Sequence, residues 1–158
     1  MTESILSVLQ RHPFVEKFAA EDVDKIAAMA TRVRFDRDQI IFREGDECSD
    51  LFLIVSGLVA LEVTEPGHTF RIQTLSAGQE FGWSALLMGS GKHFQARALE
   101  RVEALALDGG ELLNVCKRDP EFGFALMQRL LGVVAERLQA TRLQLHDMYS
   151  PIAKRAGA

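Results

Sequence analysis

Cysteine, proline, tyrosine and tryptophan are all scarce in this sequence. Its 158 residues include two cysteines, four prolines, one tyrosine and one tryptophan. Cys48 and Cys116 are far apart and have neither the spacing of a metal site nor that of a disulfide framework, so we expect a reduced, cytoplasmic setting. The four histidines are scattered and no catalytic constellation stands out, which predicts a protein without enzymatic activity or a bound metal.

Long apolar runs and an excess of positive charge are also missing. No uninterrupted apolar run approaches the roughly 18 residues of a membrane-spanning helix, and the N-terminus does not resemble a signal peptide. The formal net charge of −4 argues against a nucleic-acid surface, which is usually basic. We therefore expect neither a membrane protein nor direct DNA binding. The length fits one globular domain with a real core.

The middle of the chain consists of short segments with the residue patterns of β-strands. Val33 and Phe35 alternate with charged residues, the run 51–55 is continuously apolar, and residues 65–68 read as a hairpin turn. Short strands bounded by turn residues are typical of a sandwich or barrel. The chain is predicted to be mainly β with flanking helices: one domain over 1–148, with helices in 3–29, a β-barrel over 31–107 and C-terminal helices in 111–148, then a short tail over 149–158.

The last predicted helix begins at Asp119-Pro120, an N-cap residue followed by proline. It carries two apolar rows. The first row is Phe122, Leu126, Leu130 and Val133. The second, which we call the seam row, has the alternating steps of four and three that pair helices, and comprises Met127, Leu131, Val134, Leu138, Thr141, Leu145 and Met148. The seam row predicts a parallel homodimer, with Arg137 and Arg142 forming interhelical ion pairs with Glu136 or Asp147. The alternative is that both rows pack on the barrel.

A glycine-flanked turn over 78–87 leads into a short helical segment. Amides at a helix N-terminus lack intrahelical partners and sit at the positive end of the helix dipole, so they suit an anion. Lys92 could add a full positive charge. The turn therefore predicts a cradle for a phosphate or carboxylate, and the alternative is an ordinary tight connection with glycine wherever φ is positive.

Two segments, Gly45–Gly57 and the stretch from Gly78 to Leu99, resemble in order and spacing the cyclic-nucleotide-binding domain of the catabolite-activator and FNR family of bacterial regulators. The resemblance runs from about Phe14 to about Thr141. It implies a double-stranded β-helix (jelly roll) with a phosphate-binding cassette between two strands. It also implies a cyclic nucleotide, cyclic AMP or cyclic GMP, as the first candidate ligand.

The family's cassette reads Phe-Gly-Glu-x-Ala-Leu, followed by Arg and by Ser or Thr. Here Trp83 stands at the Glu position, Lys92 at the Arg position and His93 at the Ser/Thr position. An indole has only an N–H donor and cannot accept a bond from a ribose hydroxyl, and lysine lacks the planar fork of arginine. The matching positions are Phe81, Gly82, Ala85 and Leu86.

The resemblance extends to the final helix, where Thr141 matches the family's base-contacting threonine and Arg142 replaces a serine. The family's DNA-binding domain has no counterpart in the tail. We therefore expect a stand-alone regulatory module that binds a small anion and signals through its C-terminal helix to a protein partner. The alternative is a ligand-independent dimeric interaction module whose pocket is plugged by Trp83 and His93. The predicted ligand-binding residues are Phe81, Gly82, Trp83, Ser84, Ala85, Leu86, Lys92, His93, Thr141 and Arg142.

Overall fold

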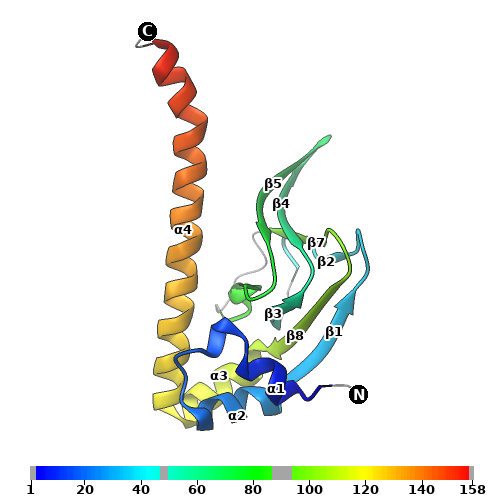
Figure 1. The fold of residues 1–158 in the computed structure, drawn as a ribbon, viewed down its shortest axis with the longest axis vertical. Coiled ribbons are helices and arrows are strands. Elements are labelled where there is room, and N and C mark those ends of the chain that lie inside the picture. The colour runs from blue at the N-terminus through cyan, green and yellow to red at the C-terminus, as the bar shows by residue number, and fades with distance from the viewer. Residues whose placement is uncertain (1–2, 47–49, 87–93, 157–158) are drawn as a thin grey trace.

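The computed structural model describes residues 3–46, 50–86 and 94–156. Strands form the middle of the chain and helices both ends (Figure 1). The strands are β1 (Ala30–Phe35), β2 (Ile40–Phe42), β3 (Asp50–Ser56), β4 (Val59–Glu65), β5 (His68–Leu75), β6 (Glu80–Phe81), β7 (Gln95–Ala98) and β8 (Val102–Asp108). The helical segments are α1 (Ile5–Gln10), η1 (Pro13–Val15), α2 (Ala20–Met29), η2 (Trp83–Leu86), α3 (Gly109–Arg118) and α4 (Pro120–Ala156), where η marks a 3₁₀ turn.

The strands form two four-stranded antiparallel sheets. One has the order β1-β8-β3-β6 and the other β2-β7-β4-β5. Strands that are distant in the sequence lie side by side, which is the jelly-roll arrangement, and this confirms the predicted fold class.

The core between the two sheets combines phenylalanines with aliphatic side chains and alanines. Phe52 of β3 and Phe81 of β6 stack with their ring centroids 4.8 Å apart. The strands β7 and β8 contribute alanines to the same core, which leaves room for these rings. The alanines are Ala96, Ala98, Ala104 and Ala106.

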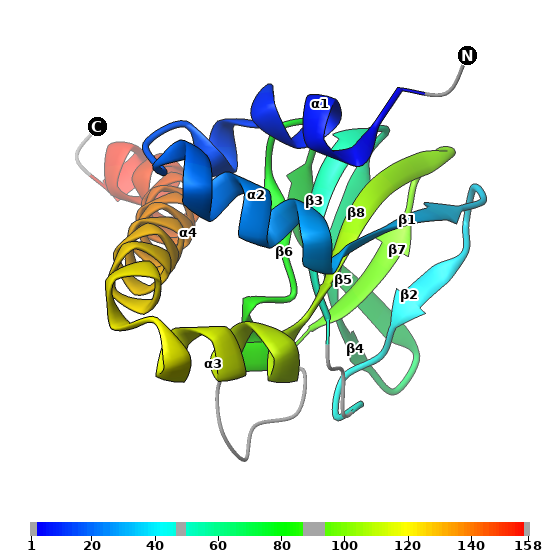
Figure 2. The same cartoon turned by 90° about the horizontal axis from the view of Figure 1, so that it is seen from below.

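A second core lies on the opposite face of the β1-β8-β3-β6 sheet, under the helices. Leu51 and Leu53 point to this side while Phe52 and Ile54 point between the sheets. Both faces of β3 are therefore buried, which explains why its sequence is continuously apolar. Figure 2, seen from below, shows α1, α2 and α3 gathered at this end of the roll, with α4 viewed nearly end-on.

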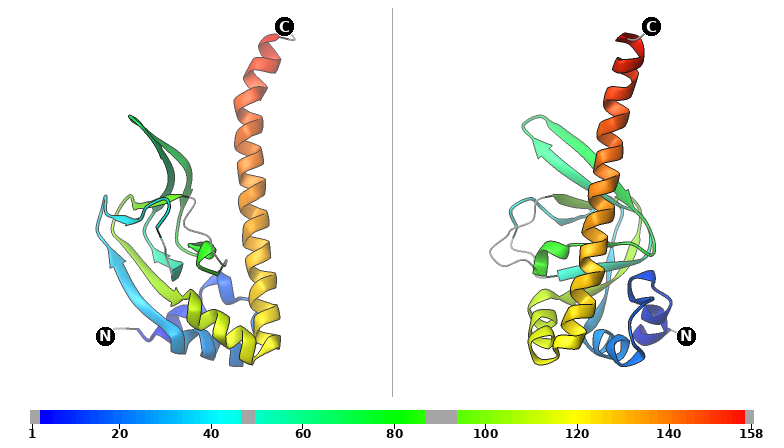
Figure 3. Two further views of the ribbon diagram at one scale, coloured as in Figure 1. Left: turned by 180° about the vertical axis from the view of Figure 1, so that it is seen from behind. Right: turned by 90° about the vertical axis from the view of Figure 1, so that its left-hand side faces the viewer.

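The helix α4 stands along one side of the roll and projects beyond it (Figure 3). The side chain of Asp119 accepts a hydrogen bond from the amide of Phe122, which confirms the predicted cap. The first apolar row is buried under the roll, whereas Met127, Leu131 and Leu138 of the seam row are exposed. The alternative in which both rows pack on the barrel is thus wrong for these residues.

Both C-terminal helices differ in their bounds from the predicted ones. The helix α4 ends at Ala156, not near 148, and continues through Pro151. A proline removes one backbone donor and crowds the preceding turn, which can leave a long helix bent rather than ended. The helix α3 is longer at both ends than the predicted 111–116. It starts at Gly109 because Asp108 caps it by accepting the amide hydrogen of Glu111, and it continues to Arg118.

Candidate functional site

The predicted cassette begins where β6 ends. The short strand β6 pairs with β3 in the register Phe52↔Phe81 and Leu53↔Glu80. Since successive side chains of a strand alternate between faces, Phe81 enters the core between the sheets and Glu80 points to the helix side. Gly82 follows with φ +87°, a conformation that favours glycine, and η2 starts at the next residue.

The 3₁₀ turn η2 uses one of the amides that the sequence assigned to an anion. The amide of Ala85 donates to the carbonyl of Gly82 at 3.0 Å, so it is not available to a ligand in this arrangement. Leu86 is buried in the core under the helices, and Trp83 packs against that same core while it also borders a cavity. The segment 82–86, which we call the cassette turn, is therefore anchored to the core under the helices by Trp83 and Leu86.

A small cavity of about 20 Å³ lies at this turn. A cavity of about 10–15 Å³ admits one water molecule, and small-molecule sites typically occupy about 300–1,000 Å³. The cavity bounded by the described residues is therefore far smaller than a typical nucleotide site. Its described lining consists of Phe42, Leu61, Phe81, Gly82, Trp83, Ser84, Phe94 and Arg137.

Arg137 of α4 is the charged side chain in that described lining, and it joins the helix to β6. One guanidinium nitrogen donates a hydrogen bond to the backbone carbonyl of Glu80. The same nitrogen lies 3.6 Å from the Glu80 carboxylate, and the arginine side chain is only 12% exposed. This contact corrects the predicted interhelical ion pair of Arg137: its carboxylate partner lies in its own chain, on β6.

Glu80 is buried between two arginines of α4. A guanidinium nitrogen of Arg129 lies 3.9 Å from the other oxygen of its carboxylate. Burial raises the pKa of Glu80, and the two arginines and its own backbone oppose that rise while Glu136 adds to it. Burial also lowers the pKa of Arg137, partly offset by Glu80 and Glu136. Both directions have one cause, because desolvation disfavours the charged form of each group.

The structure brings together part of the predicted ligand site. Phe81, Gly82, Trp83 and Ser84 line one cavity, whereas Lys92 and His93 lie outside the described residues, as does Cys48. On α4, Thr141 and Arg142 are exposed. The hydroxyl of Thr141 donates back to the carbonyl of Arg137 at 3.0 Å. The predicted contact of these two residues with a ligand stays a prediction.

Sequence reasoning missed Arg137 as a cavity residue. The signal that could have found it is its place four residues before Thr141, on the same face of a helix. An arginine beside an apolar heptad row is also a suitable partner for a second helix, so the sequence pattern alone does not distinguish the two positions.

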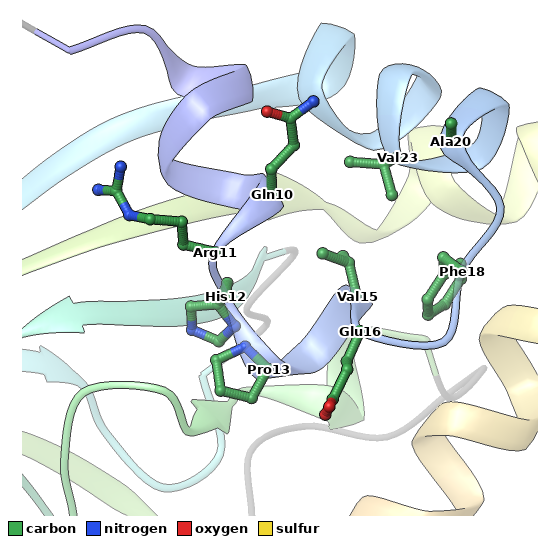
Figure 4. Close-up of a pocket in the computed structure, with 9 residues that line it drawn as sticks. All are labelled: Gln10, Arg11, His12, Pro13, Val15, Glu16, Phe18, Ala20 and Val23. Carbon is green, nitrogen blue, oxygen red and sulfur yellow. The ribbon is translucent and has the colours of Figure 1, made fainter.

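Larger grooves lie near the N-terminal helices. One of about 500 Å³ surrounds the turn between α1 and η1, where Figure 4 shows Arg11 and His12 on one side and Phe18 on the other. His12 is fully engaged there: its Nδ1 accepts the Phe14 amide hydrogen at 3.1 Å and its Nε2 contacts the Ile54 carbonyl at 2.9 Å. We interpret this groove as a surface depression beside a structural histidine.

Across the described ranges 3–46, 50–86 and 94–156, no three His, Cys, Asp or Glu side chains gather as a metal site would require. Within the same ranges, no helix combines the length and apolar character that crossing a bilayer demands.

The family profile of the cyclic nucleotide-binding domain matches residues 32–119. The cyclic AMP receptor protein of Thermus thermophilus is 31% identical over 134 residues, covering 84% of this chain and 60% of that protein. A cAMP-dependent protein kinase regulatory subunit from Mycosarcoma maydis is 28% identical over 147 residues, covering 92% of this chain and 26% of the subunit. The chain thus spans less than two thirds of either relative.

A solved cyclic nucleotide-binding domain from Methylobacillus flagellatus superposes with a TM-score of 0.76, covering 94% of this chain and 82% of that one. At 21% identity, this likeness shows the fold alone. The profile match covers more than half of the chain, and it includes β6 and the cassette turn, of which η2 is a part. The chain therefore belongs to the cyclic nucleotide-binding domain family.

Proposed function

We propose that this protein is a sensor module that binds a small anionic ligand at the cassette turn and signals through α4. The observation that carries the proposal is that Arg137 of α4 lines the same cavity as Gly82, Trp83 and Ser84. The helix that carries the exposed seam row therefore also forms one wall of the site.

Ligand entry is coupled to movement of α4, because the cavity must become larger and α4 forms part of its wall. The cavity of about 20 Å³ is far smaller than a nucleotide, so binding requires its walls to separate. Arg137 forms part of those walls, which makes a shift of α4 relative to η2 a direct way to enlarge the site. A ligand that binds the wider arrangement more tightly shifts the population toward it, by no more than its difference in affinity.

The charges of the described lining favour an anion. Arg137 supplies a cation, and the Trp83 indole supplies an N–H donor without an acceptor. Two relatives are named for cyclic AMP, which is a monoanion with a planar base. Cyclic AMP and cyclic GMP are therefore the first ligands to test, with Trp83 available to stack on the base.

Isothermal titration calorimetry with cyclic AMP and cyclic GMP, up to millimolar concentration, tests this proposal. We expect binding that Arg137→Gln weakens at least tenfold, because a charge-assisted contact is lost. Thermal unfolding of both proteins provides the control for folding. The absence of heat, together with a melting temperature that millimolar nucleotide leaves unchanged, would exclude both nucleotides as ligands.

A plugged pocket is the second candidate function, and it would make the protein a ligand-independent interaction module. The cavity volume favours it, as does the packing of Trp83 against the helix-side core. The triple variant Trp83→Glu, Lys92→Arg, His93→Ser should then bind cyclic AMP while the wild type does not. If the variant binds no better than the wild type, three side chains do not account for the lost pocket.

We further propose that the protein is a cytoplasmic regulator without enzymatic activity, that it forms a homodimer through α4, and that it acts on a protein partner. The exposed seam row supports the dimer, because Met127, Leu131, Leu138 and Met148 present apolar surface to solvent along one helix. The two relatives named above, a receptor protein and a kinase regulatory subunit, support the regulatory role.

A further inference from the structure

The Arg137 side chain lines the cavity at the cassette turn and also contacts the buried carboxylate of Glu80. We infer that Glu80 is an internal competitor of the ligand, and that an anion entering the cavity takes Arg137 from it. This inference rests on the proposed function and assigns a regulatory residue to the same site. Glu80 is here a positioning residue, since it is not part of the described lining and acts through Arg137.

The first step of the argument is that one guanidinium serves both sites. The contact between Arg137 and Glu80 involves one terminal nitrogen, which also donates to the Glu80 backbone carbonyl. A guanidinium has several N–H donors but only one positive charge, so a ligand can approach its other donors only by sharing or taking that charge from Glu80. A second anion beside it then competes with the carboxylate for one positive charge.

The second step is that Glu80 is not stranded when Arg137 turns away. Arg129 lies 3.9 Å from the other carboxylate oxygen. It is held there independently, because its Nε donates to the carbonyl of Phe14 at 3.0 Å and its guanidinium lies over the Phe14 ring at 5.3 Å. A buried carboxylate that keeps one cation can lose the other, whereas a carboxylate left unpaired could not.

The third step is that the exchange acts on one part of α4. Arg129 fixes the first turns of the helix to the η1 segment, while Arg137 lies eight residues further along. Beyond Arg137, the amide side chain of Gln144 donates to the carbonyl of Ile72 at 2.6 Å. Release of Arg137 therefore leaves the base of α4 in place and loosens the part between the base and the β5 contact.

The test compares Glu80→Gln with Glu136→Gln. Both changes remove one negative charge close to Arg137, but only Glu80 is buried against it, whereas Glu136 is exposed. We expect the Kd for cyclic AMP, measured by calorimetry, to fall about tenfold in Glu80→Gln and to change less than twofold in Glu136→Gln.

Equal affinity in the wild type and both variants would overturn the competition and leave the proposed function intact. No binding by any of the three proteins would overturn the proposed function with cyclic AMP, and the competition with it. A Kd that falls equally in both variants would show a general charge effect and would also overturn the competition.

A measurement on the wild type guards against misfolding of Glu80→Gln. In an NMR titration with cyclic AMP, the Nε signal of Arg137 and the side-chain carboxyl signal of Glu80 should shift together, while the Nε signal of Arg129 stays in place. An Arg137 signal that stays unchanged at saturation contradicts the inference.

Discussion

Gly57, in the turn between β3 and β4, combines a backbone constraint with a close contact. Its φ is +96°, and a Cβ at this position would lie 2.4 Å from the carbonyl oxygen of Arg101. A non-glycine residue in such a conformation costs about 1–3 kcal/mol before any clash is counted. We expect Gly57→Ala to lower the free energy of unfolding, measured by urea denaturation, by more than about 2 kcal/mol.

Gly67→Ala is the matched control. Gly67 also has a positive φ, of +77°, but a Cβ there would meet nothing within 4 Å. Gly67→Ala should therefore lower the free energy of unfolding only by the cost of the positive φ angle, about 1–2 kcal/mol. Equal losses in the two variants would mean that the turn moves away from Arg101 at little cost.

His12 predicts a pH dependence of stability. Burial lowers its pKa, and Arg129 lowers it further, while the bond to Ile54 raises it. The unfolded chain therefore takes up the proton first, so the free energy of unfolding falls as pH drops below about 6.5 toward the folded pKa. Glu80, whose pKa is raised, has the opposite sign: its contribution is present at low pH and is lost as pH rises through the folded pKa.

The comparison that isolates His12 is with His12→Gln, because Glu80 is common to both proteins. Between pH 7 and pH 5, the wild type should lose more unfolding free energy than the variant does. Parallel curves from urea denaturation across this range would show that His12 takes up its proton equally in the folded and unfolded states.

Residue-level prediction worked where a residue's role is local. The positive φ angles of Gly78 and Gly82 and the helix cap at Asp119 each follow from rules about a single turn of chain, and the structure shows all three. Arg137 could not be placed in this way. Its partner Glu80 is 57 residues away, and only the fold decides whether an arginine on a helix meets a strand or a second helix.

At the scale of elements, α3 and α4 approach each other closely at Gly123. A Cβ there would lie 3.0 Å from the Cβ and 3.1 Å from the carbonyl oxygen of Cys116, while a Cβ at Gly132 would meet only the far end of Arg129, at 4.0 Å. Alanine is the better helix former by about 1 kcal/mol. We therefore expect Gly132→Ala to raise the melting temperature and Gly123→Ala to lower it.

Thermal unfolding followed by circular dichroism distinguishes these two outcomes. Stabilisation by both substitutions would mean that α3 and α4 can separate slightly without loss. Destabilisation by Gly132→Ala would place an unrecognised contact at that turn of α4.

The elements themselves were largely predictable. Alternating segments gave the strands, and two apolar rows on α4 gave one buried and one exposed face. The end of α4 was not predictable, because Pro151 is a helix-ending signal that the structure overrides. The small cavity was not predictable either, since its walls come from β2, β4, β6, η2 and α4.

At the scale of the whole molecule, the exposed seam row predicts the oligomeric state. Leu138 and Leu145 of this row are 61% and 53% exposed, and Leu143, which lies off the row, is 56% exposed. In a dimer through the row, Leu138→Glu or Leu145→Glu buries a charge at the interface and should yield monomers. Leu143→Glu removes the same kind of side chain and should leave the dimer intact.

Sedimentation equilibrium measures all three variants against the wild type. A wild type that is monomeric at high concentration contradicts the proposed dimer. Dissociation by Leu143→Glu as readily as by Leu138→Glu would place the interface on another face of α4.

The length of α4 makes it a lever. Its 37 residues extend over about 55 Å, and its first turns are fixed by Arg129 to the η1 segment, while the core between the sheets is packed with aromatic rings, aliphatic side chains and alanines. The helix beyond Arg129 spans about 40 Å at a rise of 1.5 Å per residue, so a tilt of about 10° about Arg129, with the Gln144 contact to Ile72 released, would carry the far end through about 7 Å. A change at the cassette turn too small to alter the roll would thus reach the end of the helix as a displacement of more than one helical turn.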